Sequence, residues 1–401
     1  MLSAGEKQFI REHLADDVNR LALQKKYFSH PEMDFPLILR QIAGRQRIKN
    51  KIPSWYPLDG LLYPPLLSLE QCSSETAAAY KASLLSGYSL ADLTGGFGVD
   101  TAFLSKRFTC VDYVEKQSGL AEIAAHNFSV LGLANIRIHA TDCISYLREM
   151  KPVDCIFLDP ARRSGSGKKT MRMEDCDPPI PDIRNLLPGK ARRILIKLSP
   201  MLDIQSALKS LQSVTGIHVV SIENECKELL FLIDREKQGE EPLVTCVNFR
   251  KNKDAQTLTF TFTEEKNAPV SCTHETGTYL YEPNASLLKA GFYKGIASRY
   301  HLTKLHPASH LYTSPELCAA FPGRIFRVEA VSSPNRREIK EHFPVMEKAN
   351  ISVRNFPLSV EELRKKWNWK DGGDIYLFAT TLGNGKQVLI KTSRIRPEQG
   401  A

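Results

Sequence analysis

The chain lacks paired cysteines. Its nine cysteines are scattered along 401 residues, and no two of them have the C-x-x-C spacing. This distribution supports neither a zinc site nor a disulfide framework. We therefore expect reduced thiols and no bound metal.

Long apolar runs are also missing. No stretch approaches the roughly 18 apolar residues that a membrane-spanning helix needs. The first residues, Met1 to Lys7, lack the apolar core of a signal peptide, and acidic residues follow early. We expect a cytoplasmic protein that does not associate with membranes.

Acidic residues are absent from two basic stretches, 39–52 and 161–173, in a chain with a formal net charge of +9. Each stretch is either a solvated loop or a contact for an anionic partner, and nucleic acid is the partner that such clusters favour. The cations are Arg40, Arg45, Arg47, Lys49 and Lys51 in the first stretch and Arg162, Arg163, Lys168, Lys169 and Arg172 in the second.

The spacing of apolar residues predicts the fold class. Residues 1 to about 45 have helical spacing, and a proline-rich connector leads to another helix near residues 74–81. From residue 88, strands and helices alternate, which is typical of a doubly wound α/β sheet with a mostly parallel core. The expected strands are 90–93, 109–114, 136–139, 155–158, 193–198, 218–222 and 229–233.

The last two of these strands have only a short connection between them. This predicts one antiparallel strand at an edge of the sheet, an arrangement closer to methyltransferases than to simple dehydrogenases. After residue 250 the pattern changes to small α+β modules. We expect four domains, namely 1–85, 86–250, 251–321 and 322–401.

A glycine-rich turn follows the first expected strand, in the sequence from Asp92 to Thr101. A strand, a glycine turn and a helix together bring backbone N–H groups and a helix N-terminus to a nucleotide-like ligand. Glycine turns join strands to helices in many folds, so the interpretation depends on the residues that follow.

An acidic residue follows each of the next three strands within a few positions. Glu115 can accept both hydroxyl protons of a ribose, and neighbouring Asp112 is expected to point elsewhere. Asp142 can accept from an adenine amine, beside the Cys143 N–H, or cap the helix that starts there. Asp159 ends the fourth strand, at the edge where ligands of parallel sheets bind.

With these features the chain resembles the class I S-adenosylmethionine-dependent methyltransferases over about residues 70–250. The turn at 92–101 is similar to the first motif of RNA methyltransferases related to the trimethylguanosine cap synthases. Residues 67–75 look like the segment that closes over the cofactor in those enzymes. Further segments, around residues 280–284, 305–307 and 355–374, resemble the ferredoxin-like and THUMP-like modules of a bacterial family.

The resemblance implies S-adenosylmethionine as cofactor and tRNA or rRNA as substrate, with direct methyl transfer to a base nitrogen. Asp159 and Pro160 would form the catalytic motif, and Arg162, Arg163, Lys168 and Lys169 would bind substrate phosphates. The cofactor would lie against Asp92, Thr94, Gly95, Gly96, Gly98, Asp100, Thr101, Glu115, Lys116, Asp142, Cys143 and Asp159.

The fourth motif departs from the amine-methylating pattern, because Ala161 replaces its second proline and Arg162 its aromatic residue. Uracil-C5 chemistry is disfavoured, since residues 196–200 offer Ser199 where a cysteine nucleophile is needed. Two alternatives stay open. The protein could bind RNA through a catalytically altered pocket, or it could methylate a small molecule or a protein.

Overall fold

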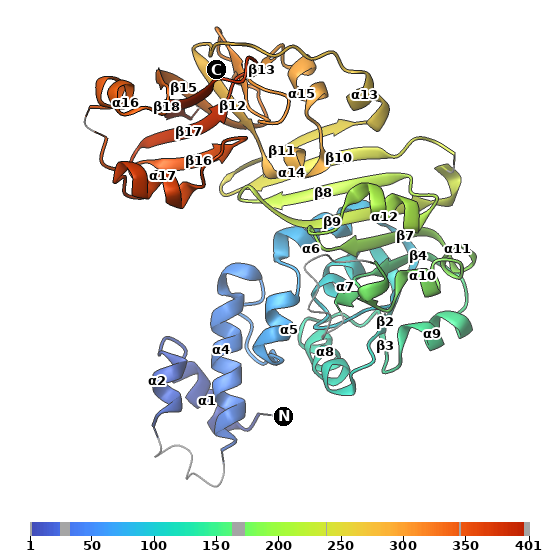
Figure 1. Ribbon diagram of the computed structural model, residues 1–401. Coiled ribbons are helices and arrows are strands. Elements are labelled where there is room, and N and C mark those ends of the chain that lie inside the picture. The colour runs from blue at the N-terminus through green and yellow to red at the C-terminus, as the bar shows by residue number, and fades with distance from the viewer. Residues whose placement is uncertain (1, 25–32, 163–172, 238, 345, 397–401) are drawn as a thin grey trace. The chain divides into compact units, whose positions relative to one another are not determined.

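The computed structural model describes residues 2–24, 33–162, 173–237, 239–344 and 346–396 (Figure 1). The chain forms two compact units. The first contains residues 1–215 and 229–240, and the second contains 216–228 and 241–401.

The first unit is built on a sheet whose strands follow the order β9-β7-β4-β1-β2-β3. The four contacts among β1, β2, β3, β4 and β7 are parallel, whereas β9 is antiparallel to β7. The predicted α/β class and the antiparallel strand are thus confirmed. The strands are β1 (Gly87–Asp92), β2 (Phe108–Val114), β3 (Ile136–His139), β4 (Val153–Leu158), β7 (Ala191–Leu198) and β9 (Glu225–Asp234).

Helices connect these strands, and side-chain oxygens start several of them. Asp142 accepts from the N–H groups of Ile144 and Ser145 at the start of α9, and Asp203 caps α12 in the same way. A short antiparallel pair, β5 (Ala161–Arg162) and β6 (Cys176–Asp177), follows β4. The helices are α7 (Val99–Leu104), α8 (Ser118–Val130), α9 (Cys143–Glu149), α10 (Ile180–Ile183), α11 (Leu187–Lys190) and α12 (Ile204–Leu211).

The N-terminal part is helical, as its apolar spacing predicted. Ser3 and Glu6 form a capping box at the start of α1. Buried side chains of α1, α2 and α4, among them Phe9, Leu21 and Ile38, pack into one cluster. The helices are α1 (Ala4–Glu12), α2 (Val18–Ala22), α4 (Phe35–Lys51), α5 (Leu66–Gln71) and α6 (Glu75–Leu84).

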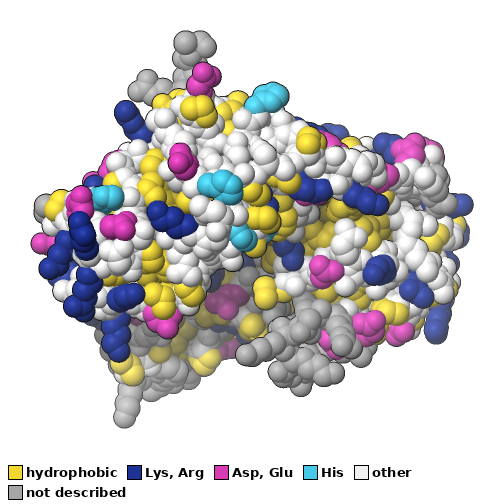
Figure 2. Space-filling model, turned by 45° about the horizontal axis from the view of Figure 1, so that its top comes forward, with side chains coloured by type: hydrophobic (Ala, Val, Ile, Leu, Met, Phe, Trp, Pro, Cys, Tyr) yellow, Lys and Arg dark blue, Asp and Glu magenta, His cyan; other side chains and the backbone are white. Residues whose placement is uncertain are grey.

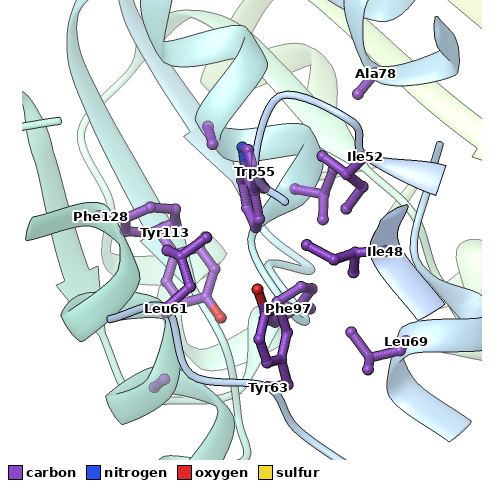
Figure 3. Close-up of a cluster of buried hydrophobic side chains, with 14 residues drawn as sticks. Ile48, Ile52, Trp55, Leu61, Tyr63, Leu69, Ala78, Phe97, Tyr113 and Phe128 are labelled. Carbon is purple, nitrogen blue, oxygen red and sulfur yellow. The ribbon is translucent and has the colours of Figure 1, made fainter. Parts of the chain in front are cut away.

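A second apolar cluster anchors the turn that follows β1 (Figure 3). Phe97, in that turn, is only 4% exposed and lies between two aromatic side chains of the proline-rich connector. Its ring centroid is 5.6 Å from that of Trp55, in a T-shaped arrangement, and 6.4 Å from that of Tyr63. The connector therefore forms part of the core that supports the turn.

The second unit contains two groups of strands. In the first group, β8 (Gly216–Ile222) is parallel to β10 (Leu243–Arg250), which is antiparallel to β11 (Lys253–Phe260). The second group is a seven-stranded sheet in the order β13-β14-β12-β15-β18-β17-β16. Its strands are β12 (Tyr279–Pro283), β13 (Thr303–Lys304), β14 (Tyr312–Ser314), β15 (Gly323–Ser332), β16 (Asn350–Arg354), β17 (Ile375–Thr381) and β18 (Gln387–Ile395).

Among the described residues of this unit, five helices accompany the strands. The capping box of Ser359 and Glu362 fixes the start of α17. In the part of the chain that the structure describes, no helix is long and apolar enough to cross a membrane. The helices are α13 (Phe262–Asn267), α14 (Ala285–Ala290), α15 (Lys294–Arg299), α16 (Arg336–His342) and α17 (Val360–Trp367).

The packing of Phe97 generates a stability prediction. Phe97→Ala removes a buried ring between Trp55 and Tyr63, and we expect it to lower the free energy of unfolding by about 3–5 kcal/mol. Urea denaturation followed by circular dichroism measures this loss. Tyr88→Ala is the control, because Tyr88 is 68% exposed and its removal leaves no cavity. Equal effects of both substitutions would contradict the assignment of Phe97 to the core.

Candidate functional site

The turn after β1 is closed by the carboxylate of Asp92, which is 1% exposed. Its Oδ1 accepts the Thr94 N–H at 3.1 Å, and its Oδ2 accepts the Thr101 hydroxyl at 2.6 Å. Burial raises the pKa of Asp92 to about 7. The side chain therefore joins the end of β1 to the first turn of α7, and it lies beneath the backbone of the turn.

The three glycines of the turn differ in what their Cα atoms face. An added Cβ at Gly95 would lie 2.1 Å from the ring of Tyr113, and one at Gly98 would lie 2.7 Å from the ring of Phe128. Packing thus requires glycine at both positions. At Gly96, which has a φ of +54°, the nearest atom would be the Thr94 carbonyl oxygen at 3.9 Å. The space beside Gly96 is open, so a ligand can approach the backbone there.

Glu115, just after β2, is bound to the same turn. One carboxylate oxygen accepts the Gly96 N–H at 2.9 Å, and the other accepts the Gln117 N–H at 2.8 Å. The Tyr113 hydroxyl donates to the Gly96 carbonyl at 2.5 Å. Asp112 instead forms ion pairs with β3 side chains. Glu115 therefore shapes the turn, and its contact with a ribose stays a prediction.

The residues after β3 have structural roles that the sequence also allowed. Asp142 caps α9, and the hydrogen bonds from Ser145 lower the pKa of its carboxyl group. Cys143 is buried, which raises the pKa of its thiol to about 12 and keeps it protonated. Lys116 forms an ion pair with Asp177 of β6. Adenine recognition by Asp142 and Cys143 stays a prediction.

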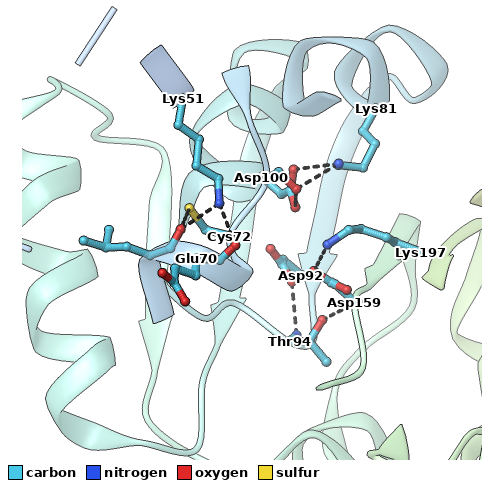
Figure 4. A network of polar contacts seen from close by, with 11 residues as sticks. Lys51, Glu70, Cys72, Lys81, Asp92, Thr94, Asp100, Asp159 and Lys197 are labelled. Atoms are coloured by element: carbon cyan, nitrogen blue, oxygen red, sulfur yellow. Dashed lines mark hydrogen bonds and ion pairs between the residues drawn. The ribbon is translucent and has the colours of Figure 1, made fainter. Parts of the chain in front are cut away.

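Asp159 follows β4 and is held from two directions (Figure 4). Its N–H donates to the Thr94 hydroxyl at 2.6 Å, which ties the end of β4 to the turn after β1. Its carboxylate forms an ion pair with Lys197 of β7. The Asp159 side chain is 31% exposed, whereas Pro160 is buried. The structure thus brings Asp159 beside the glycine turn, as the sequence predicted.

A second charged pair connects α6 to α7. Lys81, which is fully buried, has its ammonium nitrogen 3.2 Å from the Asp100 carboxylate and 3.0 Å from the Ser73 hydroxyl. The same hydroxyl donates to Asp100 at 2.7 Å. This pair fixes Ser73, within the segment expected to close over a cofactor, against the helix that follows the glycine turn.

The first basic stretch is partly occupied by contacts within the protein. Arg45 pairs with Asp59 at 2.8 Å, and Lys51 donates to the carbonyls of Leu69 and Glu70 at 2.7 Å. Arg47 lies 3.5 Å from the Glu70 carboxylate. These three side chains of the first stretch therefore make contacts within the fold and also contribute positive charge.

The second basic stretch is described only at its ends. The backbone of Arg162 pairs with Cys176 in the β5–β6 ladder, whereas Arg163, Lys168 and Lys169 lie outside the described residues. On the face drawn in Figure 2, Lys and Arg side chains stand singly or in small groups with acidic side chains between them. Among the described residues there is no group of three or more potential ligands placed for a metal ion.

Lys197 and Lys81 contribute to the site, although neither was predicted from the sequence. Lys197 lies in the apolar run of β7, near the carboxyl end of a strand that neighbours β4. Its position near the carboxyl end of a parallel strand could have identified Lys197 as a candidate site residue, because ligands bind at that edge of a parallel sheet. Lys81 lies in an alanine-rich helix, and only the fold shows that it meets Asp100.

Comparison with known proteins agrees with this architecture. A family model described as a ferredoxin-like domain matches residues 279–322, and one described as THUMP domain-like matches residues 323–394. A candidate methyltransferase from Porphyromonas gingivalis W83 is 33% identical, with 98% of each chain covered and a TM-score of 0.87. No curated protein sequence matches the chain.

Two other solved structures are similar only to part of the chain. An rRNA methylase from Streptococcus thermophilus is 16% identical, with 40% of this chain and 93% of that chain covered and a TM-score of 0.29. A candidate methyltransferase from Streptococcus mutans, in complex with SAH, is 16% identical, with coverages of 40% and 96% and a TM-score of 0.30.

The buried carboxyl group of Asp92 generates a prediction about pH. Because its pKa is raised to about 7 in the folded protein, this group stabilises the fold most fully below about pH 4, and that stabilisation is lost as pH rises toward 7. Asp92→Asn mimics the protonated form. We therefore expect the difference in unfolding free energy, wild type minus Asp92→Asn, to fall as pH rises from 4 to 7. The fall is at most about 1.4 kcal/mol per pH unit.

Urea denaturation at several pH values measures this difference. Asp154→Asn is a matched control, since the N–H groups of Ser89 and Tyr88 lower the pKa of Asp154. Its stabilisation is present above about pH 4 and is lost only below that value. Curves for wild type and Asp92→Asn that stay parallel from pH 4 to 7 would contradict the assignment.

Proposed function

The chain belongs to the bacterial family that joins a class I methyltransferase fold to ferredoxin-like and THUMP-like modules, and from this we propose its activity. The protein transfers a methyl group from S-adenosylmethionine to a base nitrogen of tRNA or rRNA. The observation that carries the proposal is the junction of Asp159 and Thr94, where the N–H and the hydroxyl lie 2.6 Å apart. It brings a partly exposed carboxylate to the edge of the glycine turn.

The residues around the turn fit the cofactor. The open space beside Gly96 allows a ligand to approach the backbone, because a Cβ there would meet only the Thr94 oxygen at 3.9 Å. Glu115 keeps acceptor capacity for a ribose, since each carboxylate oxygen has a second lone pair. Asp142 would face the adenine in the same way. When bound, the cofactor supplies an electrophilic methyl group.

The chain's contribution to the transfer is to bind and orient the acceptor. Asp159 lies at the carboxyl end of β4, where parallel sheets bind their ligands, and its carboxylate can accept an N–H of the target base. Alignment of the acceptor nitrogen with the methyl group supplies much of the rate. As positive charge develops on that nitrogen, the carboxylate stabilises it and can take up the departing proton.

RNA is favoured as the substrate by two features. The C-terminal module that matches a THUMP-like family model supports a structured RNA partner. The basic stretch that follows Asp159 supports contacts with phosphates, because its five cations are accompanied by no acid. Arg162, Arg163, Lys168 and Lys169 would bind those phosphates beside the acceptor.

The cofactor proposal is tested at Gly96. Gly96→Ala places a methyl group in the open space of the turn, so we expect it to weaken S-adenosylmethionine binding by about tenfold or more in calorimetry. Gly132→Ala is the matched control. Gly132 also has a positive φ, of +70°, and nothing lies within 4 Å of its added Cβ. Both variants should lose about 1 kcal/mol of stability from backbone strain, while the control keeps wild-type affinity.

If wild-type protein does not bind the cofactor, the proposal fails. If the two glycine variants lose affinity to the same extent, the loss comes from strain, and the open space beside Gly96 is not the cofactor site.

The substrate proposal is tested in cells. Mass spectrometry of RNA nucleosides from a deletion strain should reveal one missing methylated base, and expression of the wild-type gene should restore it. Asp159→Asn keeps the size of the side chain but removes its charge, so we expect at least about a tenfold loss of transfer. An unchanged nucleoside profile would exclude the RNA assignment and favour a small molecule or protein as acceptor. Full activity of Asp159→Asn would exclude the assigned mechanism.

A further inference from the structure

Lys197 meets the carboxylate at the centre of the proposed site. It lies in β7, and its side chain is 13% exposed, so most of its length is buried. Its ammonium group forms an ion pair with the Asp159 carboxylate (Figure 4). Burial of a lysine ammonium group requires free energy for its desolvation, and a charged partner offsets that free energy. The cation therefore has a specific partner beside the glycine turn.

Asp159 is fixed by the two strands that flank its own. β4 lies between β1 and β7, with parallel pairing on both sides. From the β1 side, the Thr94 hydroxyl accepts the Asp159 N–H and holds the backbone. From the β7 side, Lys197 holds the carboxylate. Backbone and side chain are thus positioned independently, which leaves the carboxylate a narrow range of orientations.

The surrounding charges show why a cation is needed there. Asp92 and Asp100 lie close enough for their negative charges to interact, and Asp159 likewise acts on Asp92 to raise its pKa. Lys81 compensates Asp100, and burial raises the pKa of Asp92 to about 7, which favours its protonated form below neutral pH. Asp159 is left as the carboxylate that Lys197 compensates. Among the described residues, Lys197 also lies near Lys51 on α4, whose ammonium binds the α5 carbonyls, and near the Cys72 thiol.

We propose that Lys197 is a positioning residue for methyl transfer, acting through Asp159. The ammonium group holds the carboxylate in one orientation, so that the carboxylate can accept a hydrogen of the target nitrogen. This role rests on the proposed function, because the acceptor nitrogen belongs to the proposed reaction.

Loss of Lys197 should therefore act on the chemical step. A misoriented carboxylate aligns the acceptor poorly, and such misalignment lowers kcat more than it raises the KM for the cofactor. Since Asp159 is partly exposed, we expect the loss of Lys197 to leave the variant folded. A large loss of activity in a well-folded variant is the expected signature.

The first experiment compares Lys197→Met, Lys197→Arg and Arg192→Met. The assay uses tritium-labelled S-adenosylmethionine and RNA extracted from cells that lack the protein. Methionine keeps the apolar stem without the charge, so we expect kcat to fall about tenfold or more while the KM for S-adenosylmethionine changes less than about twofold. Arginine keeps the charge and should restore kcat to within about threefold of wild type.

Arg192→Met controls for the loss of a cation from the same strand. Arg192 pairs with Glu236 at 2.8 Å, and both side chains are at least half exposed at the surface. We expect wild-type kinetics from this variant. A Lys197→Met enzyme with wild-type kcat would overturn the proposal, as would a Lys197→Arg enzyme as slow as Lys197→Met.

The second experiment does not require activity. Urea unfolding of Lys197→Met, Asp159→Asn and the double variant forms a double-mutant cycle. We expect the double variant to unfold at a higher urea concentration than the sum of the two single shifts predicts, because each single change leaves one charge without its partner. If the urea shifts of the two single variants add up to the shift of the double variant, the two side chains are not coupled and the proposal is overturned. If wild-type protein transfers no methyl group while the cycle shows coupling, the proposed function fails and the Lys197–Asp159 coupling stands.

Discussion

The buried carboxylate of Asp92 is the constraint on which the site depends. It ends β1 and accepts hydrogen bonds from both the Thr94 backbone and the Thr101 hydroxyl, so the turn and α7 start in a fixed relation to the sheet. Once Thr94 is fixed, its own hydroxyl accepts the Asp159 N–H and sets the end of β4. A single desolvated acid thereby determines the relative placement of the glycine turn and of the acceptor carboxylate.

The far side of the turn depends on the N-terminal region. Phe97 enters an apolar cluster formed with Trp55 and Tyr63 of the proline-rich connector. On the same side, the buried Lys81 pairs with Asp100 of α7. The turn is thus held by the hydrogen bonds to Asp92, by the apolar packing of Phe97 and by the ion pair between Lys81 and Asp100. Helices α4, α5 and α6 therefore help to shape the site, although they precede the sheet in the sequence.

The sequence predicted most of the fold, because periodicity and strand-ending residues are local signals. The seven strands expected between residues 88 and 233 are all present, and Asp159 lies beside the glycine turn as strand order implied. The contacts of Glu115 were not predictable, because its binding of the Gly96 and Gln117 N–H groups depends on the exact course of the turn. The pairing of Lys197 with Asp159 likewise required knowledge of which strands are neighbours.

Compensating charges explain how the protein tolerates several acidic side chains near the glycine turn. Three carboxylates, Asp92, Asp100 and Asp159, lie near one another, and like charges at short range destabilise a fold. The protein compensates each in a different way. Burial raises the pKa of Asp92 and favours its protonated form, although the hydrogen bonds from Thr101 and Thr94 act in the opposite direction. Lys81 neutralises Asp100 in the interior, and Lys197 neutralises Asp159 beside the glycine turn. Of these three carboxylates only Asp159 is substantially exposed, and its partner Lys197 comes from the neighbouring strand β7.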